Sequence, residues 1–238
     1  MPLLVQSIVV IGMWTSGVPN TRSAAIELHQ TLNAAIYQQR DKWDASTVVN
    51  VSSACEWPIP MYQAILLHII FALLSKVNGS STLDLDLKPT LKSADAELLA
   101  SLVKSCRKLG VFQYKNILAR FKPDDLDSYV WVTVEEIKRF NLALFKVCRR
   151  LSSERQHTNT HAGGDDPGTG GAPLAVTPTS WLLTAPELEF PMQTNDSLWL
   201  ATDKEEWTAA VDNVEAVDLT NMMESKWISK SADILQLT

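Results

Sequence analysis

The apolar run from Met61 to Val77 limits the possible folds of the chain more than any other feature. It contains Gln63 and His68 and is shorter than the roughly 20 apolar residues that a bilayer-spanning helix needs. The run therefore predicts a buried helix at the centre of the fold. Asn78-Gly79 supplies a stop signal directly after it. We predict no transmembrane segment in the chain.

Apolar residues at helical spacing recur in most other segments, which predicts an all-α fold. The predicted helices are Leu3–Met13, Arg22–Trp43, Ser93–Leu109, Phe112–Phe121, Val134–Leu151 and Asp203–Val217, with a shorter segment around Met222–Leu235. Leu3–Met13 lacks the basic residues that begin a signal peptide, so we interpret it as a buried core helix. Leu83–Leu87 alternates like a strand, but no second alternating run could pair with it, which favours an extended connector.

The segments between the helices carry turn and cap signals. Asp44–Pro60 is predicted as a loop broken by its prolines, with Trp57 packed into the core. Gly110 is predicted to cap the helix before it. Asp124 or Asp125 could cap the next helix, and Val130–Val134 is ambiguous between helix and strand.

Residues 152–178 form a break in composition. The sequence His161-Ala-Gly-Gly-Asp-Asp-Pro-Gly-Thr-Gly-Gly-Ala-Pro173 has too little apolar surface to offset the entropy of ordering it. We expect a disordered Gly/Pro-rich insertion over 152–178. It would separate a helical core, residues 1–151, from residues 179–238, which belong to the same domain.

The stretch Glu187–Trp207 is predicted to be a buried loop that leads into a helix. Phe190, Leu198, Trp199 and Trp207 are its expected core contacts. Thr202 and Glu205 have the spacing of a capping box, in which each side chain accepts the other residue's backbone N–H.

Composition narrows the classes of function. With 46% hydrophobic and 20% charged residues in 238, the chain is typical of a globular protein. A net charge of −6 gives no indication of independent nucleic-acid binding. Cys55, Cys106 and Cys148 are odd in number and far apart, which fits a reducing compartment.

No group of residues predicts catalysis or metal binding. His157 and His161 stand four apart, but beside a glycine-rich segment where no helix is expected. His29 and His68 fall in apolar helices and are interpreted as hydrogen-bonded core or interface histidines. Two sets of aspartates, Asp84 with Asp86 and Asp124, Asp125 and Asp127, are interpreted as turn and cap residues. Cys106 and Cys148 lie on apolar faces, which argues against reactive thiols.

Recognised catalytic and nucleotide-binding motifs are missing from the sequence. The densest basic run is interpreted as a solvated helix face; it comprises Lys104, Arg107, Lys108, Lys115, Arg120 and Lys122. The second basic group is interpreted in the same way; it comprises Lys138, Arg139, Lys146, Arg149 and Arg150.

Several segments, in order, resemble one family. Phe190-Pro-Met192, Leu198-Trp199, Ala201 and Glu205-Glu-Trp207 resemble the C-terminal signature of the fungal-specific transcription-factor domain. The same domain's early helices are similar to Pro2-Leu-Leu-Val5 with Ile11-Gly12, Ala25 and Leu28-His29. Its central helix resembles Trp57-Pro58, Tyr62–His68 and Phe71-Ala-Leu73, and the helix before the signature resembles Val134–Phe140 with Leu142-Ala-Leu144.

The resemblance implies an all-helical, non-catalytic regulatory domain in the nucleus, without cofactor or metal. It would act through protein partners of the transcription machinery, a homodimer or a small-molecule effector. Members of the family usually carry zinc fingers upstream, and this chain contains none, so we expect no direct DNA binding and interpret it as a truncated or standalone regulatory module. The alternative function is a helical enzyme or binding protein for a small apolar metabolite, with Trp57, His68 and Trp131 lining a pocket.

Overall fold

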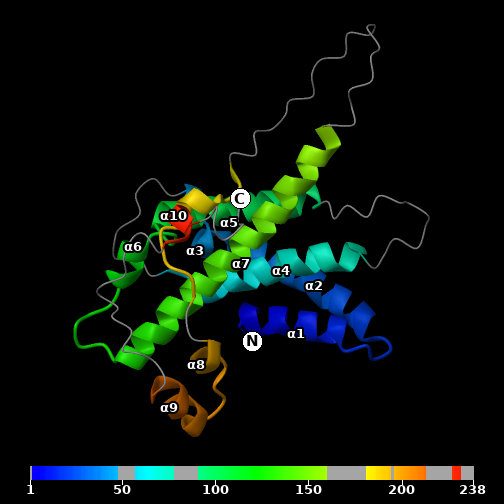
Figure 1. Cartoon of the computed structure of the whole chain (residues 1–238). Coiled ribbons are helices and arrows are strands. Elements are labelled where there is room, and N and C mark those ends of the chain that lie inside the picture. The colour runs from blue at the N-terminus through cyan, green and yellow to red at the C-terminus, as the bar shows by residue number, and fades with distance from the viewer. Residues whose placement is uncertain are drawn as a thin grey trace, which may run out of the picture. The chain divides into compact units, whose positions relative to one another are not determined.

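The structure is a computed structural model that describes residues 2–47, 57–77, 91–159, 181–193, 196–212 and 227–231. These residues are mostly helical, which confirms the all-α prediction (Figure 1). Their only strand-like pairings are two isolated β-bridges. The chain divides into two compact units: unit 1 is Met1–Leu109 with Lys146–Leu183, and unit 2 is Gly110–Phe145 with Thr184–Thr238.

Unit 1 is built around three helices. Its elements are α1 (Leu3–Thr15), α2 (Thr21–Gln38), α3 (Arg40–Trp43), the 3-10 turn η1 (Ala45–Thr47), α4 (Ile59–Val77), α5 (Ser93–Leu109) and the C-terminal part of α7 (Asp127–Asn159). Helix α1 packs against both α2 and α4 (Figure 1). Val10 and Trp14 of α1, Ala25 and Leu32 of α2 and Phe71 of α4 form one buried cluster.

The apolar run Met61–Val77 lies within helix α4, which confirms the prediction of a helix there. Ile59, Tyr62, Ile65 and Ile69 of this helix are buried. The prolines expected to break the chain before it lie at its start instead, where a proline lacks only a hydrogen bond that the first turn cannot make. Trp57 is buried directly before α4, as predicted.

Helix α1 is less buried than its sequence predicted. Ser7, Val10 and Trp14 are buried, but Ile8 is 55% exposed, and Val5 and Val9 are also exposed. The prediction of a buried core helix is therefore wrong for one of its faces. An apolar composition shows that a helix can be buried, while the number of neighbouring helices decides how much of it is.

Helix α5 ends as its sequence predicted, at Gly110. This glycine has a φ of +72°, a conformation in which a side chain is strained, and a Cβ there would collide with the amide of Asn116.

Arg107 of the same helix was predicted to lie on a solvated face, but it is half-buried. Its guanidinium donates to the carbonyl oxygens of Trp181 at 2.9 Å and Leu182 at 2.6 Å.

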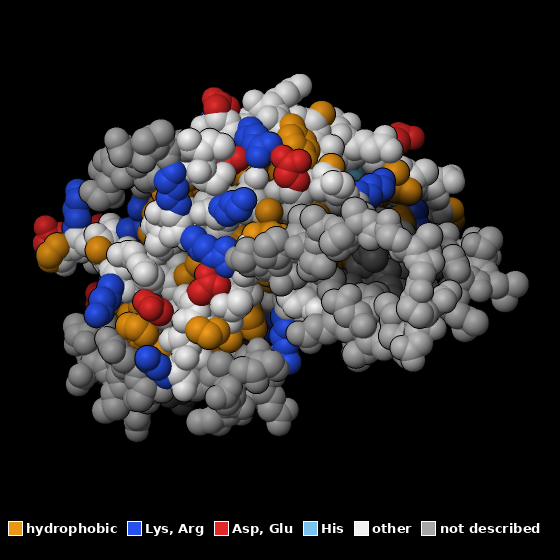
Figure 2. Space-filling model, turned by 90° about the horizontal axis from the view of Figure 1, so that it is seen from above, with side chains coloured by type: hydrophobic (Ala, Val, Ile, Leu, Met, Phe, Trp, Pro, Cys, Tyr) orange, Lys and Arg blue, Asp and Glu red, His pale blue; other side chains and the backbone are white. Residues whose placement is uncertain are grey.

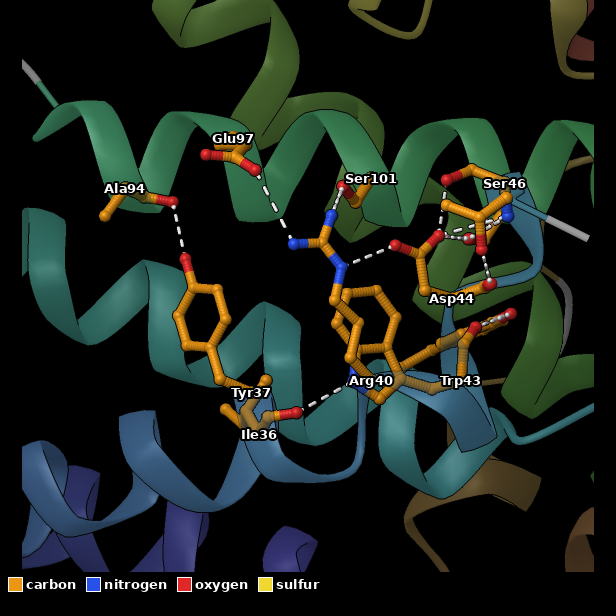
Figure 3. A network of polar contacts seen from close by, with 12 residues as sticks. Ile36, Tyr37, Arg40, Trp43, Asp44, Ser46, Ala94, Glu97 and Ser101 are labelled. Atoms are coloured by element: carbon orange, nitrogen blue, oxygen red, sulfur yellow. Dashed lines mark hydrogen bonds and ion pairs between the residues drawn. The ribbon is translucent and has the colours of Figure 1, made fainter.

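A buried carboxylate connects the corner between α2 and η1 with α5 (Figure 3). Asp44 accepts hydrogen bonds from Nε of Arg40 at 2.8 Å, the backbone N–H and hydroxyl of Ser46, and the hydroxyl of Ser105 at 3.2 Å. Burial alone would raise the pKa of Asp44, but the hydrogen bonds from Ser46, Arg40 and Ser105 outweigh it and lower the pKa below its ordinary value of 3.8. The carboxylate is therefore held ionised.

Arg40 and its neighbours extend this network along α5. The guanidinium of Arg40 donates to the hydroxyl of Ser101 at 2.9 Å and lies 3.5 Å from the carboxylate of Glu97. The hydroxyl of Tyr37 donates to the carbonyl oxygen of Ala94 at 3.2 Å (Figure 3). Helix α5 is thus held along its length by polar contacts from one corner.

We predict that Asp44→Ala lowers the free energy of unfolding by about 2–4 kcal/mol, because the half-buried donors of Ser46 and the buried hydroxyl of Ser105 lose their acceptor. Glu97→Ala is the matched control, since it removes the other carboxylate beside Arg40. The side chain of Glu97 is 66% exposed, so its loss should change stability by less than about 0.5 kcal/mol. Guanidinium denaturation followed by circular dichroism would measure both. Equal losses would contradict the assigned role of Asp44.

Unit 2 is built from the N-terminal part of α7 and several short elements. The other elements are α6 (Tyr114–Leu118), the 3-10 turn η3 (Ala185–Glu187), α8 (Asp196–Leu200), α9 (Lys204–Asp212) and α10 (Ile228–Ser231). The ambiguous segment Val130–Val134 is helical within α7. The same helix continues to Asn159, eight residues into the segment predicted as an insertion. The remainder of that segment, residues 160–178, lies outside the described residues, as do Leu83–Leu87 and Cys55.

The stretch Glu187–Trp207 contains a segment, Leu188–Phe190, whose backbone pairing its sequence did not reveal. The backbone of Glu189 exchanges hydrogen bonds with Phe112 and Tyr114, at 3.0 and 2.9 Å. On the other side, the N–H groups of Ile228 and Ser229 donate to the carbonyls of Phe190 and Leu188, at 2.9 and 3.0 Å. The segment is thus paired on both edges, which fixes the fully buried side chains of Leu188 and Phe190.

The aromatic residues of this stretch pack on α7. Trp131 lies 6.4 Å from Trp199 and 5.7 Å from Trp207, measured between ring centroids. The guanidinium of Arg139 lies over the ring of Trp199 at 4.4 Å and donates to Asp196 at 2.8 Å. Leu198 is buried and both tryptophans are half-buried, so the predicted core contacts are confirmed for this unit.

Lys138 lies in the protein interior, contrary to its predicted position. It was predicted on a solvated face, yet it is 1% exposed and forms an ion pair with Glu135, which also pairs with Arg139. Burial lowers the pKa of Lys138, while the charge and hydrogen bond of Glu135 oppose that shift. The charge is tolerated because its partner is buried with it.

The predicted capping box at Thr202 is displaced by one residue. Asp203 accepts the N–H of Glu206 at 2.8 Å, and the carboxylate of Glu206 accepts the N–H of Thr202 at 2.8 Å. Glu205 therefore has no part in the cap of α9. Asp125 accepts the N–H of Lys122 at 2.8 Å and so stabilises the loop before α7 rather than its first turn.

We predict that Glu135→Gln lowers the free energy of unfolding by about 3–5 kcal/mol, because it leaves the ammonium of Lys138 buried beside Arg139 with no compensating charge. Lys138→Met, which removes the buried cation and leaves Glu135 paired with Arg139, should cost less than about 1 kcal/mol. The same denaturation measurement compares the two. A larger loss for Lys138→Met would show that the lysine itself stabilises the fold.

Candidate functional site

A pocket of about 380 Å³ lies in unit 1 between α2, α4 and the start of α5. Its walls from α2 and α4 each follow the i, i+3, i+4, i+7 spacing of one helical face. The lining residues are Ile26, His29, Gln30 and Asn33 of α2, His68, Phe71, Ala72 and Ser75 of α4, and Lys92, Ala94 and Asp95 at the start of α5. One face of α2 and one face of α4 thus form the two long walls of the pocket. The start of α5 forms the third wall, and the hydrogen bonds around Arg40 hold α5 in position.

Two histidines form one side of the pocket. The rings of His29 and His68 are stacked, with centroids 3.9 Å apart and planes 14° from parallel. Phe71 lies one helical turn from His68, and its ring centroid is 4.6 Å from that of His29. The three rings line the pocket together with the apolar side chains of Ile26 and Ala72.

The hydrogen bond of His29 determines its tautomer. Its Nε2 lies 3.1 Å from the backbone carbonyl oxygen of His68. A carbonyl can only accept, so Nε2 carries the proton and donates it. In the neutral ring, Nδ1 of His29 is then a hydrogen-bond acceptor.

His68 does not fit the prediction of a hydrogen-bonded core histidine. Its side chain is 1% exposed, and neither Nδ1 nor Nε2 has a hydrogen-bond partner among the described residues. A buried polar group in this condition costs free energy that an apolar ring of the same shape would not. The stability of the fold therefore does not explain a histidine at this position.

Both imidazoles are neutral at physiological pH. Burial, together with the neighbouring His29, lowers the pKa of His68 from 6.5 to about 3. Burial also lowers the pKa of His29, although its hydrogen bond to His68 and the charge of Asp95 oppose the shift and Lys92 adds to it. Each neutral ring offers one donor and one acceptor.

The charged side chains of the pocket have opposite signs. Lys92 and Asp95 are the charged members of its lining, and Asp95 lies in the first turn of α5. The pocket consequently presents no net charge to a ligand. The described residues contain no group of three or more histidine, cysteine or acidic side chains that could hold a metal ion.

Asp124, Asp125 and Asp127 are not among the lining residues of this site. Helix α7 extends through His157, contrary to the expectation of an irregular segment there, while His161, Asp84 and Asp86 lie outside the described residues. Cys106 and Cys148 are buried, as their apolar helix faces predicted, and burial raises the pKa of the Cys106 thiol.

The residues proposed to line an enzyme pocket are not all found at the site. His68 lines it, but Trp57 is not among its lining residues, and Trp131 belongs to unit 2, where it packs on Trp199 and Trp207. Sequence reasoning also missed Asn33, Lys92 and Asp95. Their signal was weak, because polar residues at a helix surface or start are ordinary.

A second pocket, of about 670 Å³, lies between α1, α2 and the start of α4. Its lining residues carry no titratable side chain; they are Pro2, Leu3, Leu4, Gln6, Thr31, Ala35, Gln39, Pro58, Pro60 and Met61. It offers less chemistry for selecting a ligand than the histidine pocket does.

The surface shows no concentration of positive charge on the face seen in Figure 2, where basic and acidic side chains are interspersed among the described residues. Lys104, Lys108, Lys115, Arg120 and Lys122 are exposed, as a solvated face requires. Within the described part of the chain, no helix has the length and apolar character to cross a membrane.

No protein-family model, curated protein or solved structure matches the chain.

We predict that His68→Phe raises the midpoint of thermal unfolding at pH 7, corresponding to about 1 kcal/mol or more, because it removes two buried nitrogens that lack partners. The substitution should also reduce the dependence of the free energy of unfolding on pH. Between pH 6.5 and about 3 the unfolded chain binds a proton at His68 that the folded chain does not. Wild-type stability therefore falls with decreasing pH, by up to about 1.4 kcal/mol per unit from this group.

Thermal unfolding at several pH values between 7 and 4 would measure both effects. His157→Phe makes the same chemical change at a histidine that is not among the described lining residues, and it serves as the control. An unchanged pH dependence in His68→Phe would contradict the burial of a neutral imidazole.

Proposed function

We propose that the chain is the regulatory domain of a fungal-type transcription regulator, acting in the nucleus through protein partners or a small effector. It would be non-catalytic and would lack DNA-binding fingers of its own. The primary support is the ordered set of segments that resemble the fungal-specific transcription-factor domain.

The positions of those segments in the fold are compatible with the proposal. Tyr62–His68 lies within α4, and Val134–Phe140 lies within α7. The Phe190–Trp207 signature packs on α7 through Trp199 and Trp207. The residues that carry the resemblance are mainly packing residues, and a helical fold is what the resemblance implies.

The observation that carries an effector-responsive role is the pocket containing His29 and His68. A general base works best when its pKa lies near the working pH. The pKa of His68, about 3, makes its imidazole a weak base at neutral pH, although the ring can still form hydrogen bonds. The chemistry of this group therefore favours recognition of a ligand over proton abstraction.

The same pocket supports the second candidate, a binding protein for a small apolar metabolite without a role in transcription. Ile26, Phe71 and Ala72 supply an apolar lining for either function. The two candidates differ in whether the domain changes transcription when it is placed at a promoter.

We predict that the chain, fused to a heterologous DNA-binding domain, changes reporter transcription several-fold relative to that DNA-binding domain alone. The Asp44→Ala fusion should lose the effect because the fold is weakened, whereas Glu97→Ala should retain it. Immunoblotting would normalise for the amount of each fusion. Neither activation nor repression by the wild-type fusion, at matched amounts, would refute the proposed function.

A further inference from the structure

The pocket of His29 and His68 has features that select a ligand by charge. Neither imidazole is protonated at neutral pH, and the charges of Lys92 and Asp95 oppose one another. A carboxylate or ammonium group that reached His68 would be desolvated without a full counter-charge, which is costly. The pocket therefore favours an uncharged ligand.

The hydrogen-bonding groups of the pocket also restrict which uncharged ligands can bind. His29 offers an acceptor at Nδ1, because its Nε2 donates to the carbonyl oxygen of His68. His68 offers one donor and one acceptor, both buried and without partners among the described residues. A hydroxyl group can donate to one imidazole nitrogen and accept from another N–H, so it matches what the two rings present.

The other lining residues and the volume of the pocket determine the size and polarity of the rest of the ligand. Ile26, Phe71 and Ala72 provide apolar contact beside the stacked rings, and Gln30 and Asn33 add amides. A volume of about 380 Å³ lies at the lower end of the range of roughly 300–1,000 Å³ for small-molecule sites. These dimensions suit a compact ring or short branched chain rather than a peptide.

We propose that this pocket binds a small, uncharged ligand with an apolar, ring-sized body and a hydroxyl group that hydrogen-bonds His68. The inference rests on the proposed function, because it defines the chemical class of the effector. Binding at this site can nevertheless be measured without transcription.

Phenol is the probe, and three molecules of similar size test each part of the proposal. Toluene lacks the hydroxyl, benzoate carries a negative charge and benzylammonium carries a positive charge. The sequence contains four histidines, so a histidine-labelled NMR spectrum of the whole chain resolves the site directly. His157 and His161 serve as internal references.

Phenol is expected to shift the ring signals of His29 and His68 saturably, in the millimolar range expected of so small a ligand, and to leave those of His157 and His161 in place. Toluene, benzoate and benzylammonium are expected to bind at least tenfold more weakly. Equal binding of toluene would overturn the hydrogen bond to His68. Equal or tighter binding of either ion would overturn the selection by charge, and shifts of all four histidines or none would overturn the site.

Two variants locate the ligand. His68→Phe should abolish phenol binding, measured by calorimetry, while His157→Phe leaves it unchanged. Ile26→Trp, which keeps both histidines as reporters, should block the pocket at its partly exposed wall and also abolish the shifts. Retained binding in a folded Ile26→Trp variant would place the ligand elsewhere.

The two proposals fail in different ways. A reporter effect without saturable phenol binding would refute the ligand class and leave the regulatory function standing. Phenol binding that depends on His68, in a chain without any reporter effect, would refute the regulatory function and leave the ligand site standing.

Discussion

The buried carboxylate of Asp44 is the interaction on which the arrangement of unit 1 most depends. It collects donors from Arg40, Ser46 and Ser105, and so joins the corner after α2 to α5. Through Arg40 and Tyr37 the same corner holds Ser101 and Ala94. Ala94 lies between Lys92 and Asp95 in the third wall of the histidine pocket, so the shape of this pocket depends on a polar network that does not itself line it.

Periodicity made most helices of this chain predictable, because burying one face requires apolar residues at a 3.6-residue repeat. Periodicity could not show which polar residues are buried beside the apolar face. Lys138 is buried because Glu135 and Arg139 accompany it, and a pairing of that kind depends on packing rather than on local sequence. The backbone pairing of Leu188–Phe190 was missed for the same reason, since its hydrogen-bond partners come from distant parts of the chain.

The candidate site was only partly predictable. His29 and His68 were recognised as polar residues in apolar helices, but a sequence does not reveal whether a buried imidazole finds a partner. His29 does, at the backbone of His68, and His68 does not. Lys92 and Asp95 reach the pocket only through the tertiary placement of α5. The stacked rings and their depressed pKa values, which define the chemistry of the site, are thus products of the fold.

The division of the chain into units has a consequence for how the protein is assembled. Each unit combines two separate segments, and the long helix α7 passes from unit 2 into unit 1 between Phe145 and Lys146. During synthesis, unit 1 cannot be completed until Leu182 has emerged, because Arg107 donates a hydrogen bond to the carbonyl oxygen of Leu182. Unit 2 cannot be completed until Ile228 and Ser229 have emerged, because their N–H groups donate to the segment Leu188–Phe190. Both units therefore close late and over long sequence separations, which favours slow, interdependent folding rather than one unit finishing before the other starts.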